Sequence, residues 1–519
     1  MAIVGPPLAA PPPLHEVLRA GLETNPDAVA LVSSVRALSW RELDEARRSL
    51  ASGYLGLGLR PGDRVASLLP NRIDLAIHYL ACFAAGLVAT PLNYRYTARE
   101  MDHALEVSGA AVLVAHDERT SDVAESRLAG TLPAGRVWFE GPGAGGPRFE
   151  DVAAAPPLGD LASDPAAPAV IFFTSGSTGP AKGVTHSAET VAWMTAIAAA
   201  AFELTPADAF LPGSSMSHLG SFLWTLAALS AGAKVVVARN LESPAMLPLL
   251  RTERPTVLAM LPAALTALIR DPDATAADFA SLRICRAGAD KVSQQLDDDF
   301  MRLAGFLIDE GYGMTEVGLA TLNPPSGEIR PGSIGRPAPG VAISVRDDAG
   351  EEVPPGTVGR IWIRTPGRTV GYWGDPAASA AVVRDGWLDS GDLARADEDG
   401  YLWFFGRKKQ IIVHDGSNIT PFEVEDALLE HPGVGLAGVV GVDDAVHGES
   451  VRAYVTLTGD GPPPTEAELI GFTRERIGYK APEEVVILDE MPLNATGKVD
   501  RAGLKRVAEE HLHPHGLPR

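Results

Sequence analysis

Residues 174–183 read Thr174-Ser175-Gly176-Ser177-Thr178-Gly179-Pro180-Ala181-Lys182-Gly183 and directly follow an apolar run at residues 169–173. Glycines let a loop wrap closely around an anion, backbone N–H groups and small hydroxyls donate to its oxygens, and Lys182 adds positive charge. This composition predicts a polyphosphate site, and the candidate ligand is a nucleotide. The spacing differs from G-x-x-x-x-G-K-[ST], which argues against the usual NTPase loop. An ordinary surface loop is the simpler alternative, but such loops rarely follow so apolar a strand.

Composition narrows the classes of protein. The chain has 519 residues, more than one hydrophobic core usually organises, so at least two domains are expected. Hydrophobic residues make up 46% and charged residues 21%, as in ordinary globular proteins. The net charge of −22 argues against nucleic acid as a partner. Apolar runs fall short of the roughly 20 residues that span a bilayer. Cys82 and Cys285 lie in apolar runs, which indicates buried thiols and a reducing, cytoplasmic setting.

The hydrophobic period changes along the chain. A strand-like run at residues 65–69 precedes a helical run at 73–85. Further short apolar runs occur at residues 112–115, 234–238 and 257–261. This alternation predicts a wound α/β core with parallel strands. Residues 141–157 are rich in Gly and Pro and are expected to form a loop. Between about residues 340 and 405 the period becomes two, which predicts an antiparallel sheet or a small barrel.

The segment after residue 406 has a pattern of its own. Helical and strand-like runs alternate there, at residues 421–430, 451–457, 466–477 and 485–488. About 110 residues suffice for a small independent domain. We therefore expect two domains, residues 1–406 and residues 407–519.

Four further motifs follow the phosphate-binding stretch. They are Gly311-Tyr312-Gly313-Met314-Thr315-Glu316, Ser390-Gly391-Asp392-Leu393, Gly406-Arg407-Lys408-Lys409-Gln410 and Pro492-Leu493-Asn494-Ala495-Thr496-Gly497-Lys498. In this order they resemble the motifs of the adenylate-forming superfamily, which contains acyl-CoA synthetases, adenylation domains of nonribosomal peptide synthetases and luciferases. The resemblance implies an α/β fold: a large N-terminal domain of wound mixed sheets with a small β-barrel-like subdomain, and a small mobile α+β C-terminal lid. The hinge is expected near residues 407–410, where Gln410 replaces the usual Asp or Lys.

The resemblance also implies which residues bind ATP. The β- and γ-phosphates are assigned to residues of the first motif, namely Thr174, Ser175, Gly176, Ser177, Thr178, Gly179 and Lys182. Glu316 is the expected Mg²⁺ ligand, because this hard ion prefers oxygen donors. Thr315 is expected to donate its hydroxyl to the α-phosphate.

Four segments are expected to surround the adenosine. Tyr312 offers a ring for stacking on adenine, and Gly288 and Ala289 are expected along the base edge. Asp392 can accept both ribose hydroxyls, and Arg407 can add donors to the same sugar. A core tyrosine and a surface ion pair are the alternatives.

Three residues are assigned to the acyl group. Lys498 is expected to insert between the substrate carboxylate and the α-phosphate during adenylation. Rotation of the lid would then withdraw Lys498 and bring Gly416 to the path of the pantetheine arm. His218 is expected to position the carboxylate or to gate the pocket, and a packed core histidine is the alternative.

The implied enzyme is an AMP-forming acid–thiol ligase, an acyl-CoA synthetase. It activates a carboxylic acid to acyl-AMP with release of pyrophosphate and then transfers the acyl group to CoA. The acyl pocket is expected between residues 216–220 and 317–319, which carry no charged side chain, so an apolar aliphatic, aryl or polycyclic acid is favoured. Gly220, Ser221 and Gly318 are expected to leave room for it.

Other functions were weighed against this one. A stand-alone ligase that loads an acyl carrier protein is an alternative, and a luciferase-like oxygenase is a more distant one. A nucleotide-sensing protein without catalysis would lack Lys498 or Glu316, and both are present.

Overall fold

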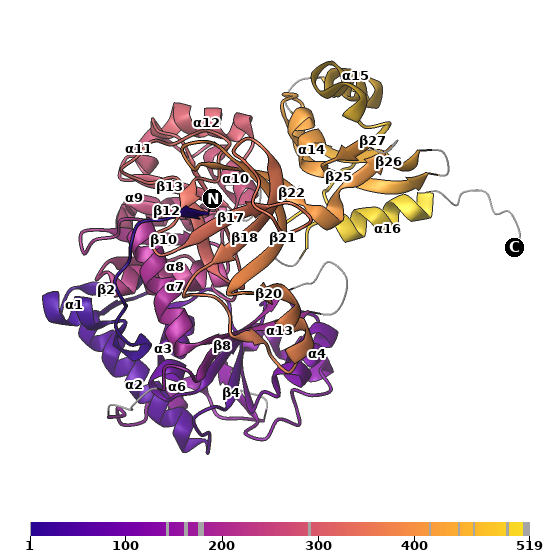
Figure 1. Cartoon of the computed structure of the whole chain (residues 1–519). Coiled ribbons are helices and arrows are strands. Elements are labelled where there is room, and N and C mark those ends of the chain that lie inside the picture. The colour runs from indigo at the N-terminus through magenta and orange to yellow at the C-terminus, as the bar shows by residue number, and fades with distance from the viewer. Residues whose placement is uncertain are drawn as a thin grey trace, which may run out of the picture.

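The structure is a computed structural model that describes residues 2–141, 145–159, 164–174, 181–288, 292–414, 417–444, 447–459, 462–494 and 498–511. Within these ranges the strands form four sheets. Three sheets belong to the large N-terminal part and one to the small C-terminal part, which sits beside β21 (Trp387–Ala396) and β22 (Leu402–Arg407) (Figure 1).

One sheet of the N-terminal part has the strand order β19-β9-β8-β5-β4-β6-β7. Its parallel strands are β4 (Arg64–Leu68), β5 (Val88–Pro91), β6 (Val112–His116), β7 (Arg136–Phe139) and β8 (Pro168–Thr174). Its antiparallel edge consists of β9 (Lys182–Ser187) and β19 (Gly371–Tyr372). Its connecting helices are α3 (Ile73–Ala84), α4 (Ala98–Ser108), α5 (Thr120–Glu125) and α6 (Phe149–Ala153).

A second sheet has the order β16-β15-β14-β13-β12-β10-β11-β2-β3. Its parallel strands are β2 (Val29–Ser33), β10 (Ala209–Gly213), β11 (Lys234–Val237), β12 (Val257–Met260), β13 (Ile284–Gly288) and β14 (Asp309–Met314). Antiparallel strands close both edges, β3 (Ala37–Ser39) on one side and β15 (Gly318–Leu322) with β16 (Arg336–Pro337) on the other. Its helices are α1 (Arg19–Thr24), α2 (Trp40–Gly56), α9 (Ser243–Glu253), α10 (Pro262–Ile269), α11 (Ala276–Phe279) and α12 (Gln294–Ala304).

Two apolar helices, α7 (Ala188–Ala201) and α8 (Leu219–Ser230), connect the core of these two sheets. Both helices are largely buried, because apolar residues cover most of their circumference. Phe222 of α8 packs edge-to-face on Phe172 of β8 at 5.0 Å between ring centroids. This packing fixes the N-terminal end of α8, which carries His218, next to the seven-stranded sheet.

The third sheet confirms the predicted period of two. Its path is β1-β17-β18-β21-β20, with β22 paired to β21. The strands are β1 (Ile3–Val4), β17 (Ala342–Arg346), β18 (Val358–Arg364), β20 (Val383–Arg384), β21 and β22, and α13 (Pro376–Val382) precedes β20. The described strands form an antiparallel sheet, the first of the two predicted alternatives, and no closed barrel is detected among them. Closure would require β1 and β20 to pair, but each lies at an end of the strand path.

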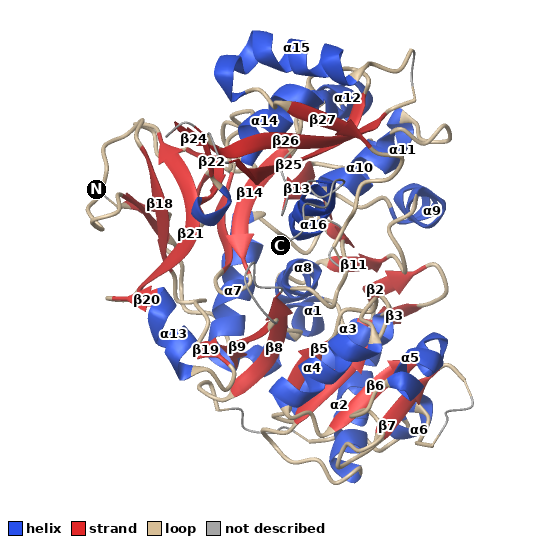
Figure 2. Cartoon of the chain, turned by 90° about the vertical axis from the view of Figure 1, so that its right-hand side faces the viewer, coloured by secondary structure: helices blue, strands red, loops and turns tan. Residues whose placement is uncertain are grey.

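The C-terminal part has a sheet and core of its own (Figure 2). Its strands are β23 (Ile412–His414), β24 (Ser417–Ile419), β25 (Val434–Asp444), β26 (Gly448–Leu457) and β27 (Glu484–Ile487). Its helices are α14 (Pro421–Leu429), α15 (Glu466–Ile477) and α16 (Arg501–His511). The four runs read from the sequence are confirmed as α14, β26, α15 and β27, and the predicted α/β arrangement of a large and a small domain is confirmed as well.

One expectation for the N-terminal part needs correction. Residues 141–157 were expected to be a loop, but Phe149–Ala153 forms the short helix α6. Phe149 and Val152 are buried, and Gly53 of α2 lies so close that a Cβ there would stand 1.9 Å from the carbonyl oxygen of Val152. Two buried side chains and a close backbone contact therefore give this segment a helix despite its glycines and prolines.

Candidate active site

The predicted phosphate-binding stretch connects two antiparallel strands. Thr174 ends β8 and pairs with Lys182, the first residue of β9. The predicted phosphate ligands between them, Ser175, Gly176, Ser177, Thr178 and Gly179, lie outside the described residues. Lys182 is exposed, and its ammonium group lies 5.2 Å from the ring centroid of Tyr372. The hairpin thus brings the two ends of the glycine-rich stretch opposite each other.

Thr315 and Glu316 lie in the turn between β14 and β15. The Nε2 atom of His186 donates to the carbonyl oxygen of Thr315 at 2.8 Å. His186 is fully buried, and burial lowers its pKa to about 4, so the ring is neutral near pH 7. His186 was not among the predicted residues. It fixes the backbone of Thr315 from β9, which links this turn to the phosphate-binding hairpin.

Glu316 is buried and burial raises the pKa of its carboxyl group, while a hydrogen bond from Tyr372 opposes this shift. The Tyr372 hydroxyl donates to Oε1 of Glu316 at 2.9 Å. Tyr372 therefore stands between Glu316 and the ammonium group of Lys182. The sequence analysis missed Tyr372, because β19 is a two-residue strand with no period to read.

The structure brings Asp392, Tyr312 and Arg407 together. The Tyr312 hydroxyl donates to Oδ2 of Asp392 at 2.7 Å, and Nε of Arg407 lies 3.3 Å from Oδ1. Asp392 is 4% exposed, and burial raises its pKa against the opposing effects of Tyr312, Arg407 and Lys498. Among the described residues, Oδ1 of Asp392 has no hydrogen-bond partner. A buried acceptor with a free lone pair suits a ligand hydroxyl.

Lys498 of the C-terminal part lies close to this cluster. Its positive charge lowers the pKa of both His218 and Asp392, although they belong to α8's N-cap and to β21. Burial is the larger cause of the His218 shift and brings its pKa to about 4. Nε2 of His218 lies 3.1 Å from Nδ2 of Asn93. The N-terminal and C-terminal parts of the chain thus approach each other at the ammonium group of Lys498.

The loop that carries Lys498 is held at both ends. The backbone N–H of Asn494 donates to the Lys498 carbonyl at 2.7 Å, and the Lys498 N–H donates to Oδ1 of Asn494 at 3.1 Å. Leu493 and Val499 form an antiparallel bridge beside them. These contacts close the turn that presents the lysine.

The structure describes only some of the residues predicted to line the adenine edge and the path of the pantetheine arm. Gly288 ends β13 opposite Gly311 of β14. Ala289 and Gly416 lie outside the described residues.

The expected acyl pocket is partly filled by side chains. A Cβ at Gly318 would stand 3.0 Å from Met194, and Ser221 is fully buried with its hydroxyl 2.5 Å from that of Ser214. Val317 and Leu319 are also buried in the core. Gly220 is partly exposed, and a Cβ there would have no neighbour closer than 3.6 Å. Of Gly220, Ser221 and Gly318, only Gly220 therefore leaves room for the acid.

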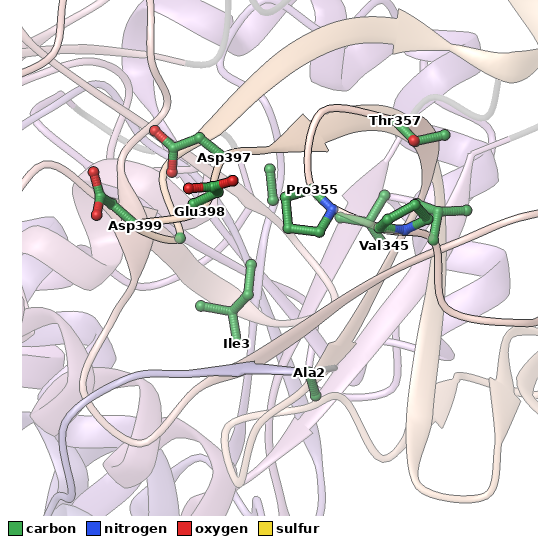
Figure 3. A pocket seen from close by; sticks show the side chains of 12 residues that line it. Ala2, Ile3, Val345, Pro355, Thr357, Asp397, Glu398 and Asp399 are labelled. Carbon is green, nitrogen blue, oxygen red and sulfur yellow. The ribbon is translucent and has the colours of Figure 1, made fainter.

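A separate pocket lies on the six-stranded sheet. Figure 3 shows Ile3 and Val345 with the carboxylates of Asp397, Glu398 and Asp399 at its edge. None of the predicted site residues lines it. Arg330 forms ion pairs with two of these carboxylates, those of Asp397 and Asp399.

The known-protein comparisons agree with this geometry. Residues 18–373 match the AMP-binding enzyme family, and residues 423–498 match the AMP-binding enzyme C-terminal domain. The chain belongs to the AMP-binding enzyme family. The first match alone covers more than half of the chain and includes Tyr312, Glu316 and Tyr372. The predicted adenylate-forming family is therefore confirmed.

Curated relatives of this AMP-binding enzyme are acid ligases. A feruloyl-CoA synthase from an Amycolatopsis species is 34% identical over 93% of this chain and 96% of its own length. The fatty acid–[acyl-carrier-protein] ligase ScoC of Streptomyces coeruleorubidus is 32% identical over 92% of this chain and 93% of its own. The prediction of an AMP-forming acid–thiol ligase is confirmed by this family and these relatives.

Solved structures of MatB from Rhodopseudomonas palustris resemble the AMP-binding enzyme in two states. The ATP-bound form is 27% identical, covers 96% of this chain and 100% of its own, and gives a TM-score of 0.88. The apo form is 28% identical, covers 96% and 99%, and gives a TM-score of 0.78. The present structure is thus closer to the ATP-bound form.

Proposed function

We propose that this AMP-binding enzyme uses ATP to convert an apolar carboxylic acid, aliphatic, aryl or polycyclic, into an acyl-AMP and then into an acyl-CoA thioester. The observation that carries the proposal is the position of Lys498, whose charge acts on both Asp392 and His218. A lysine in this position can reach a carboxylate that meets the nucleotide's α-phosphate. The reaction forms an acyl–phosphate bond and releases pyrophosphate.

The proposed roles follow from the charges that develop. A carboxylate is a poor electrophile, and in adenylation both the attacking carboxylate and the departing pyrophosphate are anionic. The transition state therefore needs cations and aimed donors rather than a protein nucleophile. Lys498 would stabilise the attacking oxygen and the α-phosphate, Thr315 would donate its hydroxyl to that phosphate, and Lys182 would hold the outer phosphates.

The nucleoside would be held by Asp392 and Tyr312. Oδ1 of Asp392, which lies in an ion pair with Arg407 but has no hydrogen bond among the described residues, fits a ribose hydroxyl, while Oδ2 is kept in place by Tyr312. Arg407 would add a donor at the same edge. Tyr312 packs against Phe404 at 6.0 Å between ring centroids, a contact that would orient its ring for stacking on adenine.

Mg²⁺ is proposed at Glu316. No group of three His, Cys, Asp or Glu side chains in the described part of the chain could hold a metal ion. A single buried carboxylate still fits Mg²⁺, which is commonly bound by one or two carboxylates together with substrate phosphates and water. When bound, the ion would neutralise charge on the phosphates. Tyr372 would keep Glu316 oriented toward them.

The second half-reaction is proposed to follow a rotation of the lid. We propose residues 1–406 and 407–519 as the two domains, with the hinge at residues 407–410. Gly406 adopts a φ of +110°, and a Cβ there would stand 3.0 Å from Phe422, so this junction suits a glycine. Rotation would withdraw Lys498 and bring Gly416 toward the pantetheine arm of CoA.

The acyl acceptor is proposed to be CoA. The feruloyl-CoA synthase of the Amycolatopsis species supports this choice. Loading of an acyl carrier protein is the second candidate, because ScoC, similar over nearly the same length, is named for that reaction.

The cytoplasm is the proposed location, where ATP and CoA are available. Cys82 and Cys285 are both buried free thiols, as expected in a reducing compartment. Among the helices in the described ranges, none has the length and apolar character to cross a bilayer.

The test is ATP–pyrophosphate exchange over a panel of aliphatic, aryl and polycyclic acids, followed by mass detection of the thioester with CoA or with an acyl carrier protein. We expect exchange that depends on both acid and Mg²⁺, and an acyl-CoA product. Absence of exchange with every acid would overturn the proposal. Exchange with a product only on the carrier protein would select the second candidate.

A further inference from the structure

Arg286 is a charged residue buried beside the candidate active site. It lies in β13 and is 5% exposed. Its guanidinium carbon is 5.3 Å from the ring centroid of Trp224 and 5.5 Å from that of Phe202. Burial lowers the pKa of Arg286 to about 10, and the carboxyl group of Asp309 on the adjacent strand opposes this shift. The group therefore stays protonated at neutral pH, and the interior holds a positive charge.

One hydrogen-bond donor of Arg286 is buried without a partner. Its NH1 atom has no hydrogen-bond partner among the residues that the structure describes. A guanidinium carries five N–H donors in a rigid planar fork. Desolvated donors of this kind are costly unless they are paired, so a buried arginine with an unpaired donor requires an explanation. No hydrogen bond joins Arg286 to Asp309 on the adjacent strand.

The guanidinium lies against glycines of the site. A Cβ at Gly311 would stand 2.5 Å from NH2 of Arg286, and a Cβ at Gly288 would stand 3.7 Å from Nε. Both glycines are partly exposed, and Gly311 directly precedes Tyr312. Glycine at residue 311 therefore leaves space that the guanidinium reaches.

Trp224 connects Arg286 to the His218 end of the site. Its indole Nε1 is 3.6 Å from the position that a Cβ of Gly220 would take, and Gly220 is two residues from His218. Gly220 is also the small residue that leaves room. Gly220, Trp224 and Arg286 therefore lie in succession from the His218 end of the site.

We propose that Arg286 determines substrate specificity by donating hydrogen bonds to an oxygen at the end of the acid remote from its reacting carboxyl group, while Trp224 packs against the ring between them. This inference rests on the proposed function and narrows its substrate class to ring-bearing acids with a distal oxygen. The oxygen belongs to a carboxylate, a phenol or a carbonyl group. The expected acyl pocket had no charged side chain, because it was drawn from residues 216–220 and 317–319 alone. Arg286 lies outside both segments.

The first test uses the wild-type enzyme alone. ATP–pyrophosphate exchange is measured with three cinnamic acids whose para substituent is a carboxylate, a hydroxyl or a methyl group, and with the best acid of the general panel beside its methyl isostere. We expect kcat/KM about 10-fold or more higher for the oxygen-bearing member of each pair, because a desolvated donor site discriminates strongly against an analogue that lacks the acceptor. Comparison of the para-carboxylate acid with the para-hydroxyl acid shows whether the oxygen that Arg286 binds is anionic.

The second test uses Arg286→Met and Arg286→Lys. We expect Arg286→Met to lower kcat/KM for the oxygen-bearing acid about 10- to 100-fold, mainly through KM, and to leave the methyl acid unchanged or improved. Arg286→Lys should restore part of the selectivity. Arg270→Met, which removes a surface ion pair with Asp299, serves as the control and should keep the wild-type ratio.

The outcomes separate this inference from the proposed function. Exchange in which the methyl acids equal or exceed the oxygen-bearing ones would overturn the role of Arg286 and leave acid activation standing. Equal loss with both kinds of acid in Arg286→Met, without rescue by lysine, would make Arg286 structural and also overturn the inference. Absence of exchange with all acids would overturn the proposed function itself.

Discussion

The carboxylate of Asp392 is buried, with one oxygen held by a hydrogen bond and the other only in an ion pair with Arg407. Tyr312 holds Oδ2, and Oδ1 lies without a hydrogen bond among the described residues. Leaving a buried acceptor unpaired costs free energy, on the order of 1–3 kcal/mol. Such a cost is expected at a binding site, where the ligand supplies the missing donor. The carboxyl group of Asp309 is also buried, and it lies near the charge of Arg286.

Asp392→Asn should raise the KM for ATP about 10- to 100-fold, because hydrogen bonds to a charged group contribute about 1.5–3 kcal/mol. The measurement is ATP–pyrophosphate exchange at saturating acid. Asp389→Asn is the matched control on the same strand, where Asp389 accepts from Arg360 in a partly exposed ion pair at 2.8 Å. A similar rise in both variants would contradict the ribose role.

The stability of the enzyme should depend on pH through Asp309. Burial raises the pKa of this carboxyl from an ordinary 3.8 to about 7, with Arg286 opposing the shift. The native state then binds a proton that the unfolded state releases, so this stabilisation is complete below about pH 4 and is lost as pH rises to about 7. Asp309→Asn does not ionise and should not show the loss.

The expected measurement is the free energy of unfolding of both proteins in denaturant between about pH 5 and pH 8. The stability of Asp309→Asn relative to wild type should increase up to about pH 7 and level off above it. Asp309→Asn also removes a charge near Arg286. This changes the free energy of unfolding by a constant amount and leaves its predicted dependence on pH unchanged. A difference that stays flat across this range would show that Asp309 is ionised throughout.

Among the elements, short hairpins and a two-residue strand assemble the site. The β8–β9 hairpin presents Thr174 and Lys182, the β14–β15 turn presents Thr315 and Glu316, and β19 pairs with β9. His186 and Tyr372 connect these elements by hydrogen bonds to Thr315 and Glu316. Hydrogen bonds therefore connect the residues proposed to bind phosphate with the residue proposed to bind Mg²⁺.

Tyr372→Phe should weaken Mg²⁺ activation about 10-fold, because partners that orient a metal ligand commonly contribute 10- to 100-fold in affinity or activity. The readout is the Mg²⁺ concentration for half-maximal exchange. Tyr401→Phe is the control, since the Tyr401 hydroxyl donates to the Glu328 carbonyl outside the site at 2.8 Å. An unchanged Mg²⁺ requirement in Tyr372→Phe would remove this role.

Gly313→Ala should destabilise the β14–β15 hairpin by about 1–3 kcal/mol, because its Cβ would stand 2.2 Å from the backbone carbonyl oxygen of Gly318. Backbone atoms cannot rotate away as a flexible side chain can. Gly471→Ala is the opposite control: Gly471 is exposed in α15 with nothing within 4 Å of its Cβ position, and alanine there should stabilise by about 0.5–1 kcal/mol. The measurement is the change in unfolding free energy of both variants relative to wild type, obtained from thermal unfolding.

For the whole molecule, the arrangement of the C-terminal domain decides which half-reaction the structure represents. Phe422 of α14 packs on Phe404 of β22 at 5.4 Å, and the charge of Lys498 reaches Asp392 and His218. The greater similarity to ATP-bound MatB than to its apo form agrees with this arrangement. We therefore interpret the structure as the conformation for adenylation.

Lys498→Ala should lower acyl-adenylate formation by at least about 100-fold, because it removes a cation from the site of developing charge. Thioester formation from chemically prepared acyl-AMP should be nearly unchanged, since the proposed rotation of the lid would by then have withdrawn the lysine. Lys505→Ala, on α16 of the same domain, should leave both half-reactions intact. Equal losses of both half-reactions in Lys498→Ala would exclude a role limited to adenylation.

The sequence by itself determined the fold class and, through the resemblance of its motifs, the family. Hydrophobic period is a local property, so it was sufficient to predict the wound core and the antiparallel section, whereas the roles of residues from Thr174 to Lys498 were assigned from that resemblance. The open third sheet, helix α6, Tyr372, His186 and Arg286 depended on tertiary structure. Each is set by contacts between segments far apart in the chain, such as Glu316 with Tyr372 and Arg286 with Trp224, and no local pattern encodes which distant side chain fills or charges a given space.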